Sequence, residues 1–299
     1  MRKFFSGLWR VLTAPFRFLA RIFSPITRWF KNLSNEINVL FTEEPEDEPL
    51  PDTFAKTMEN PMGLMEHIGA LRKHLLRAVI FMGVTTVFSF LFTAQIIDLL
   101  SKPIGGIEGL QAIDVTESVG TFMRVALLCG FALALPYIAF ELWLFAAPGL
   151  SKRSRIFGLI AIPLVVLFFM GGVAFAYFGM LPTALPFLLN FMGITTIPRP
   201  STYIGFVTSL MFWIGISFEF PLVIYVLASM SIIDAKTLAH QWRLALVIIA
   251  VMAAAITPTV DPINMSLVMG PLFILFLLSI GLAFLAQRGR SPEETSNNI

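Results

Sequence analysis

The sequence predicts an all-α integral membrane protein with six transmembrane helices, and three observations support that fold class. Hydrophobic residues make up 57% of the 299 positions and charged residues only 13%, which excludes a soluble globular domain of this length. The apolar residues gather in runs long enough to cross a bilayer as helices. The cations fall mostly on alternate connections between these runs, which predicts that both termini are cytoplasmic.

Residues 1–41 predict a basic amphipathic helix on the membrane surface. Their apolar residues recur at steps of three and four, which puts them on one helical stripe. The cations fall largely off that stripe, no acid precedes Glu36, and Trp9 and Trp29 lie near the apolar side. We expect residues 1–40 to bind anionic lipids. A coiled-coil arm is the alternative, but the polar face lacks the opposite charges that pair such helices.

Three further stretches complete the predicted domain organisation. Residues 42–61 are acidic and proline-rich and predict a disordered linker. Residues 62–290 hold the six apolar runs and predict one six-helix domain. Residues 291–299 predict a disordered tail. No uninterrupted apolar core of signal-peptide length occurs in the first forty residues, so we expect no cleaved signal there.

The six predicted spans differ in length. They cover residues 77–97, 119–146, 157–178, 203–230, 244–256 and 265–286. The fifth has only about thirteen residues before Thr257 and Pro258, or roughly 20 Å of helix against a hydrocarbon core of about 30 Å. We therefore expect a short fifth helix that does not cross the bilayer unaided.

The cations between the spans predict the orientation. One set of connections holds Arg72, Lys73, Arg77, Lys152, Arg153, Arg155, Lys236, Arg243, Arg288 and Arg290. The opposite set holds only Lys102 and Arg199. Since cations favour the cytoplasmic side, we expect a multi-pass protein of the cytoplasmic (inner) membrane with both termini inside. The outer connections, residues 101–118 and 179–202, are longer and rich in glycine and proline, and both an ordered cap and loose loops fit this composition.

A carboxylate stands near the middle of the fourth predicted span. An ionised Glu219 would cost several kcal/mol at that depth, so it must be protonated, paired or open to a water-filled groove. Pro221 removes the N–H that would bond the Ser217 carbonyl, which predicts a bend beside the acid. A pathway or relay site is the functional interpretation. A protonated glutamate that hydrogen-bonds a neighbouring helix is the structural one.

Signatures of enzymes are absent from the sequence. His67, His74 and His240 all lie outside the predicted spans, so no intramembrane histidine is available to activate a serine. The chain has one cysteine, no phosphate-binding loop and no Cys/His cluster. We therefore predict no catalytic residue, no metal site, no cofactor and no nucleic-acid partner.

Four short elements carry a family resemblance. Residues 67–76 (HIGALRKHLL) resemble an HLxELRxRL element, and residues 141–150 (ELWLFAAPGL) resemble a helix that runs into a cytoplasmic loop. Residues 216–221 (ISFEFP) match an FE(x)P element, and Thr257-Pro258 with Asp261 resemble a TP(P)xD turn. In this order they are similar to TatC, the polytopic signal-peptide receptor subunit of the twin-arginine protein translocase. The resemblance covers residues 62–290.

The resemblance implies a receptor of the Sec-independent pathway, not an enzyme. Such proteins bind twin-arginine signal peptides of folded precursors at the cytoplasmic face. They assemble with single-span TatA-type and TatB-type partners in an oligomeric complex, and the proton-motive force drives transport. We expect the signal-peptide site at Glu66, His67, Leu71, Arg72, Lys152 and Arg153. We further expect an intramembrane partner contact at Glu219 and Pro221, and an outer turn at Thr257, Pro258 and Asp261.

The sequence departs from the family pattern at two acids. Ala70 and Ser154 stand where the family has glutamates, the carboxylates implied to meet the two arginines. Glu66 lies four residues before Ala70 and shares its helical face, so it is a candidate replacement. Glu141 or Asp234 is a weaker candidate for the second contact. The alternative is that Glu66 caps the helix entrance and pairs with a nearby cation.

Two other functions remain open from the sequence. One is a secondary transporter that uses Glu219 as a proton or cation site, although no convincing internal repeat accompanies it. The other is a divergent scaffold of the same fold that keeps partner binding without signal-peptide recognition.

Overall fold

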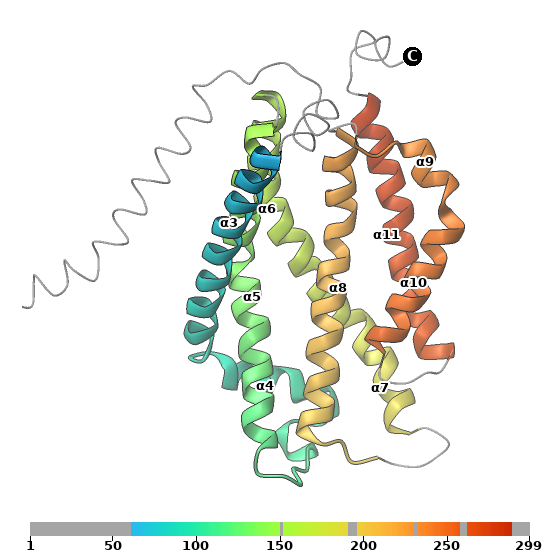
Figure 1. Ribbon diagram of the computed structural model, residues 1–299. Helices are drawn as coiled ribbons and strands as arrows, with labels where there is room; N and C mark the ends of the chain where they lie inside the picture. Colours follow the sequence, from blue (N-terminus) through green and yellow to red (C-terminus); the bar gives the residue numbers. More distant parts are fainter. Residues whose placement is uncertain (1–60, 150–151, 191–195, 230–231, 258–261, 289–299) are drawn as a thin grey trace, which may run out of the picture.

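The computed structural model describes residues 61–149, 152–190, 196–229, 232–257 and 262–288 (Figure 1). Every regular element within these ranges is a helix. The predictions for residues 1–41, for the linker up to residue 60 and for the tail at 291–299 lie outside the described residues. Pro61, predicted as the end of the linker, is instead the first residue of a helix.

The first predicted span does not run through as one helix. Helix α3 (Pro61–Ser89) starts well before residue 77, and α4 (Thr93–Ser101) turns away from it by 74°. The hydroxyls of Ser89 and Thr93 each donate to the carbonyl four residues earlier, at 2.8 Å in both cases. Such side-chain bonds compete with the helical ladder and favour bending, a signal that apolar run length does not register.

Four long helices follow the predicted spans, and each begins a few residues earlier than predicted. They are α5 (Glu117–Ala146), α6 (Lys152–Phe175), α8 (Pro200–Ser229) and α11 (Pro262–Arg288). Each contains an internal proline, and α8 continues through Pro221 as one helix. The smaller elements are the 3₁₀ turns Lys102–Ile104, Ile107–Gly109 and Ala147–Gly149.

The outer connection predicted from residue 179 begins later. After α6 the chain makes a π-turn, Ala176–Met180, and continues as α7 (Leu181–Leu189). Pro182 falls in the first turn of α7, directly after the π-turn. The apolar helical stretch thus runs over residues 158–189, and the prolines that indicated a loop are accommodated within it.

Length and composition mark four described helices as candidate membrane spans, and five if the bent pair α3–α4 is one span. Helix α10 (Trp242–Ile256), preceded by the short α9 (Ala235–His240), has only 15 residues. The prediction of a short fifth apolar helix is therefore confirmed. The count of six spans stays a prediction.

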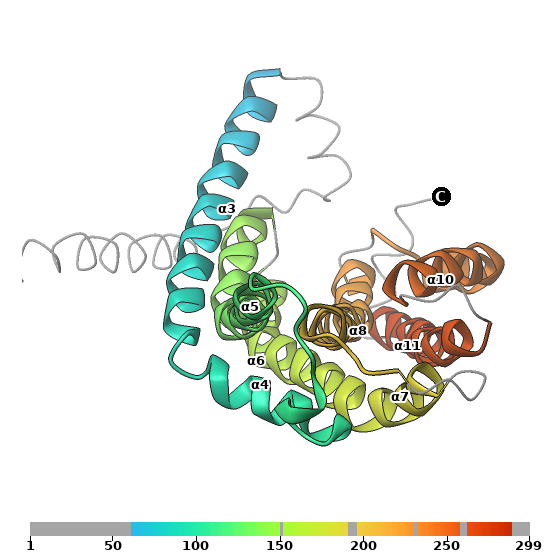
Figure 2. The same cartoon turned by 90° about the horizontal axis from the view of Figure 1, so that it is seen from below.

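The helices pack around α8 (Figures 1 and 2). Helices α5, α6 and α11 contact it directly, while α3 packs chiefly on α5 and α10 chiefly on α11. Glycines allow α6 and α8 to approach closely, because a Cβ on Gly172 of α6 would lie only 2.9 Å from the Cα of Gly215 in α8. Since lipid tails are as apolar as leucine, such close contacts stabilise helix pairs in a membrane.

The end of the bundle that holds the connections predicted to be outer is ordered by hydrogen bonds in the described residues. The Tyr177 and Tyr203 hydroxyls donate to the carbonyls of Leu99 and Leu100 at the end of α4, at 2.7 and 2.8 Å. On the same side the Arg124 guanidinium donates to the Ser201 carbonyl at 2.9 Å, and Arg199 pairs with Glu117. These bonds tie α4, α5 and α8 together.

Candidate functional site

The polar contact between α3 and α5 is the candidate functional site, and we name it the α3–α5 seam. It has one row of side chains on each helix. Helix α5 contributes Tyr137, Glu141 and Phe145, and helix α3 contributes His67, His74, Arg77 and Phe81. The residues of α5 follow one another at steps of four, which keeps all three on one helical face.

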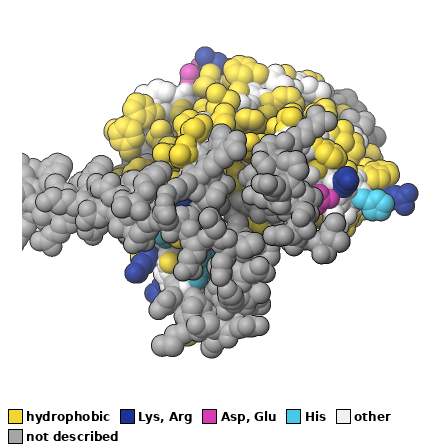
Figure 3. All heavy atoms as spheres, turned by 90° about the horizontal axis from the view of Figure 1, so that it is seen from above, with side chains coloured by type: hydrophobic (Ala, Val, Ile, Leu, Met, Phe, Trp, Pro, Cys, Tyr) yellow, Lys and Arg dark blue, Asp and Glu magenta, His cyan; other side chains and the backbone are white. Residues whose placement is uncertain are grey.

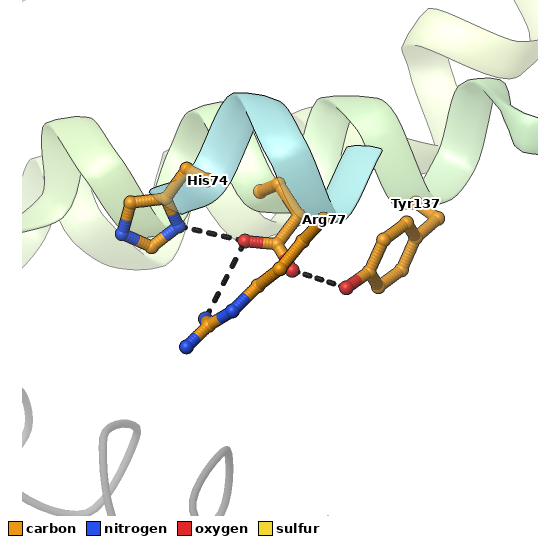
Figure 4. Close-up of polar contacts among 4 residues, drawn as sticks. His74, Arg77 and Tyr137 are labelled. Carbon is orange, nitrogen blue, oxygen red and sulfur yellow. Dashed lines mark hydrogen bonds and ion pairs between the residues drawn. The ribbon is translucent and has the colours of Figure 1, made fainter. Parts of the chain in front are cut away.

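Glu141 is the centre of this seam (Figure 4). Its side chain is only 1% exposed. The Nδ1 atom of His74 lies 2.6 Å from Oε2, the Tyr137 hydroxyl donates to Oε1, and the Arg77 guanidinium lies 3.8 Å from Oε2. A buried carboxylate is tolerated only when its oxygens are hydrogen-bonded and its charge is balanced. The seam provides both.

Aromatic contacts extend the seam toward the end of α5. The rings of His67 and Phe145 have centroids 4.5 Å apart, and His74 meets the same phenylalanine at 6.2 Å. Phe81 packs on Tyr137 with centroids 4.3 Å apart. The amino-terminal half of α3 is thereby held against the last turns of α5, beside the connection to α6.

That connection is fixed by Trp143 and Arg155. The Trp143 indole N–H donates to the Arg155 carbonyl at 3.0 Å. The buried Arg155 side chain returns to the carbonyls of Ala147 and Pro148, at 2.8 and 3.4 Å. Gly158 lies against the indole ring, where a Cβ would come within 2.6 Å of Trp143 Cδ1. The two ends of the α5–α6 connection are thus joined.

The sequence-predicted signal-peptide residues fall on these two elements. His67, Leu71 and Arg72 are exposed on α3. Lys152 and Arg153 begin α6, and Glu66 lies in α3, but the side chains of these three are outside the described part. The contact between His67 and Phe145 brings α3 to the α5–α6 connection, although these two residues are 78 positions apart in sequence.

Sequence reasoning missed most of the seam. The sequence makes Glu141 only a weaker candidate for the site and indicates no binding role for His74, Arg77 or Tyr137. The signal present in the sequence was the four-residue spacing from Tyr137 to Glu141 to Phe145. Asp234, the other weaker candidate, caps α9: its carboxylate accepts the Thr237 N–H at 3.0 Å, and this bond holds the pKa of Asp234 below its usual range.

Glu219 lies apart from the seam, in α8. Its side chain is half-buried, and its Oε1 atom is buried with no hydrogen-bond partner among the described residues. The described part of the chain holds no cluster of His, Cys, Asp and Glu suited to a metal ion. Of the predicted outer turn only Thr257 is described; it is buried and its hydroxyl donates to the Ala253 carbonyl at 2.9 Å. Pro258 and Asp261 lie outside the described residues.

Comparison with known proteins gives one consistent family. The family model described as Sec-independent protein translocase protein (TatC) matches residues 66–271. The TatC protein of Carboxydothermus hydrogenoformans is 35% identical over 228 residues, which cover 75% of this chain and 94% of that protein. The TatC protein of Deinococcus radiodurans is 35% identical over 240 residues, covering 77% and 88%. A crystal structure of the twin arginine translocase receptor TatC superimposes with a TM-score of 0.67 at 32% identity, covering 74% of this chain and all of that one.

Proposed function

The chain belongs to the TatC family of Sec-independent protein translocase proteins, and from this premise we propose that it binds the signal peptides of folded precursors carrying twin arginines. The binding face is the end of the bundle where α3 meets the α5–α6 connection. On the cation distribution, this end is cytoplasmic, both termini are inside, and the protein lies in the inner membrane. The role is recognition and assembly, without a catalytic step.

The observation that supports this proposal best is the contact of His67 with Phe145. It brings together the two elements that the sequence assigns to one binding site. The seam then holds α3 in place, and the bonds between Trp143 and Arg155 hold the connection. A preorganised surface of this kind lowers the entropy that is lost when an extended peptide binds.

A pair of guanidinium groups requires carboxylates, ideally with two hydrogen bonds to each. Glu141 is already engaged by His74, Tyr137 and Arg77, so it is poorly placed to receive a second guanidinium without rearrangement. Glu66 is the acid that we propose for the first arginine, one helical turn from Ala70.

Partner binding is the second part of the proposal. Glu219 has a buried oxygen without a partner in the described structure, and a polar group on a single-span helix would supply one. Single-span proteins of the TatA and TatB type, in an oligomeric complex, are the proposed partners. The basic amphipathic residues 1–40 are proposed to attach to anionic lipids of the same leaflet.

A second candidate function is a scaffold that binds partners but no signal peptide. Ala70 and Ser154 favour it, because both lack the carboxylate that the family resemblance leads one to expect. A secondary transporter centred on Glu219 is the third candidate, and it would bind no precursor at all.

Photo-crosslinking of a precursor separates these functions. A photoreactive residue at the exposed Ile68 is expected to capture a twin-arginine precursor and to lose it when both arginines become lysines. Glu66→Gln is expected to reduce capture, and the additional Ala70→Glu change to restore it. Equal capture of both precursors contradicts twin-arginine recognition and supports the scaffold, whereas capture of neither precursor contradicts the receptor and fits both the scaffold and the transporter. Unchanged capture in Glu66→Gln removes Glu66 from the site.

A further inference from the structure

A basic and aromatic surface lies where α9 meets α10, away from the α3–α5 seam. Lys236, His240, Trp242 and Arg243 are all exposed there, and we name this surface the α9–α10 corner. The Arg243 guanidinium stands 5.6 Å from the centre of the Trp242 ring, in cation–π geometry. In Figure 3, Lys, Arg and His side chains gather at the edge of the molecule on the α9–α10 side.

The corner is a fixed part of the fold. Asp234 caps α9 through the Thr237 N–H and accepts the Gln287 amide from the end of α11 at 3.1 Å. Ala235 is fully buried in a cluster with Ala228 of α8 and Ala283 of α11. The acid of the corner is therefore engaged in holding α9, while the cations point to the surrounding medium.

The exposed side of α10 carries a tryptophan at its start and aliphatic side chains beyond it. Trp242 at its start is 47% exposed, and Leu244, Val247 and Val251 beyond it are all more than half exposed and apolar. Tryptophan and cations at one end of an exposed apolar helix are typical of the boundary between headgroups and acyl chains. The ammonium, guanidinium and indole N–H groups are donors that suit a phosphodiester anion.

We propose that the α9–α10 corner binds the phosphate groups of anionic phospholipids and holds the start of α10 at headgroup level. A helix of 15 residues is about 22 Å long, roughly 8 Å short of a hydrocarbon core. At its other end Thr257 is buried and bonded to Ala253. Because the corner holds the start of α10 at headgroup level, the missing length of about 8 Å lies at the other end of the helix, in the opposite leaflet. In the orientation proposed above, that leaflet is the outer one. Lipid binding at the corner does not depend on signal-peptide recognition.

Lipid quenching of a fluorophore tests this assignment in the full chain. A double variant, Cys129→Ser with Val247→Cys, has a single cysteine for one NBD fluorophore on the exposed face of α10, beside the corner. The protein is reconstituted in phosphatidylcholine that contains nitroxide-labelled phosphatidylglycerol or, at the same mole fraction, nitroxide-labelled phosphatidylcholine. A label at Leu167→Cys, on the exposed face of α6, reports the bulk lipid.

The anionic quencher is expected to be enriched several-fold over the zwitterionic one at Val247→Cys and not at Leu167→Cys. Each surface cation contributes roughly a fivefold preference. Lys236→Gln with Arg243→Gln is expected to abolish the enrichment, while Lys236→Arg with Arg243→Lys keeps it and Lys102→Gln leaves it unchanged. Equal quenching by the two lipids beside the corner would overturn the proposal, as would enrichment that persists in the double glutamine variant.

Discussion

Glu141 is a carboxylate inside a helix–helix contact, and its three partners explain why it is tolerated there. His74 and Arg77 come from α3 and Tyr137 from α5, so the acid joins the two helices as well as being satisfied by them. Since α3 packs chiefly on α5, this cluster contributes strongly to the position of the amino-terminal helix.

Glu141→Ala is expected to destabilise the protein by about 1–3 kcal/mol, because it removes the buried acceptor of the partly buried His74 and Tyr137 side chains and the neighbour of the Arg77 guanidinium. Glu141→Gln keeps the shape and an acceptor for Tyr137, and is expected to recover most of that loss. Thermal unfolding in detergent measures both variants. The matched control is Asp98→Ala, which removes an exposed carboxylate and should leave the Tm unchanged. An alanine variant as stable as the parent would show that the seam does not hold α3.

Glu219 differs from Glu141 because one of its oxygens has no partner in the described structure. If that oxygen serves a partner helix, Glu219→Gln and Glu219→Ala should both weaken crosslinking to single-span partners and transport, with little change in Tm. Ser217→Ala is the nearby control, since its hydroxyl donates to the Trp213 carbonyl of its own helix. Transport that survives in both Glu219 variants makes the residue dispensable, and a loss of stability alone supports a packing role.

At the scale of elements, the α5–α6 connection depends on a close approach. The Trp143 indole N–H reaches the Arg155 carbonyl because Gly158 has no side chain that would clash with the indole ring. Arg155 then closes the connection from the other side, through the carbonyls of Ala147 and Pro148. The cations Lys152 and Arg153 lie between these fixed points in sequence, which is why the connection matters for the proposed binding face.

Gly158→Ala is expected to displace Trp143, because the added Cβ would lie 2.7 Å from Nε1 of the indole. The cost is about 1–3 kcal/mol, typical of an overpacked contact. Precursor crosslinking at Ile68 should fall together with the Tm. Gly171→Ala, at a position where a Cβ meets nothing within 4 Å, is the matched control and should change neither. A Gly158→Ala variant with unchanged Tm would mean that the indole moves freely.

At the scale of the whole molecule, apolar run length predicted where the long helices lie, including the short α10. It did not predict the break between α3 and α4, because the apolar run continues through Phe90–Phe92 while hydroxyls redirect the backbone. Nor did it predict the continuation through the π-turn into α7, since Pro182 and Pro186 indicated a loop. The seam escaped prediction for another reason: His74 and Glu141 lie 67 positions apart in sequence, and one sequence carries no record of that pairing.

The bilayer around the bundle is expected to be thinner beside α10 than beside the longer helices. Four described helices are long enough to span it, whereas α10, at about 22 Å, is not. The mismatch of roughly 8 Å must be met by thinning of the lipid or by neighbouring protein. Spin labels placed along α10 are therefore expected to show water access near both ends and a narrow zone of oxygen access between them. Labels along α11, with its 27 residues, serve as the internal control and should report a wider dry zone. Labels that stay dry up to both ends of α10 would contradict thinning.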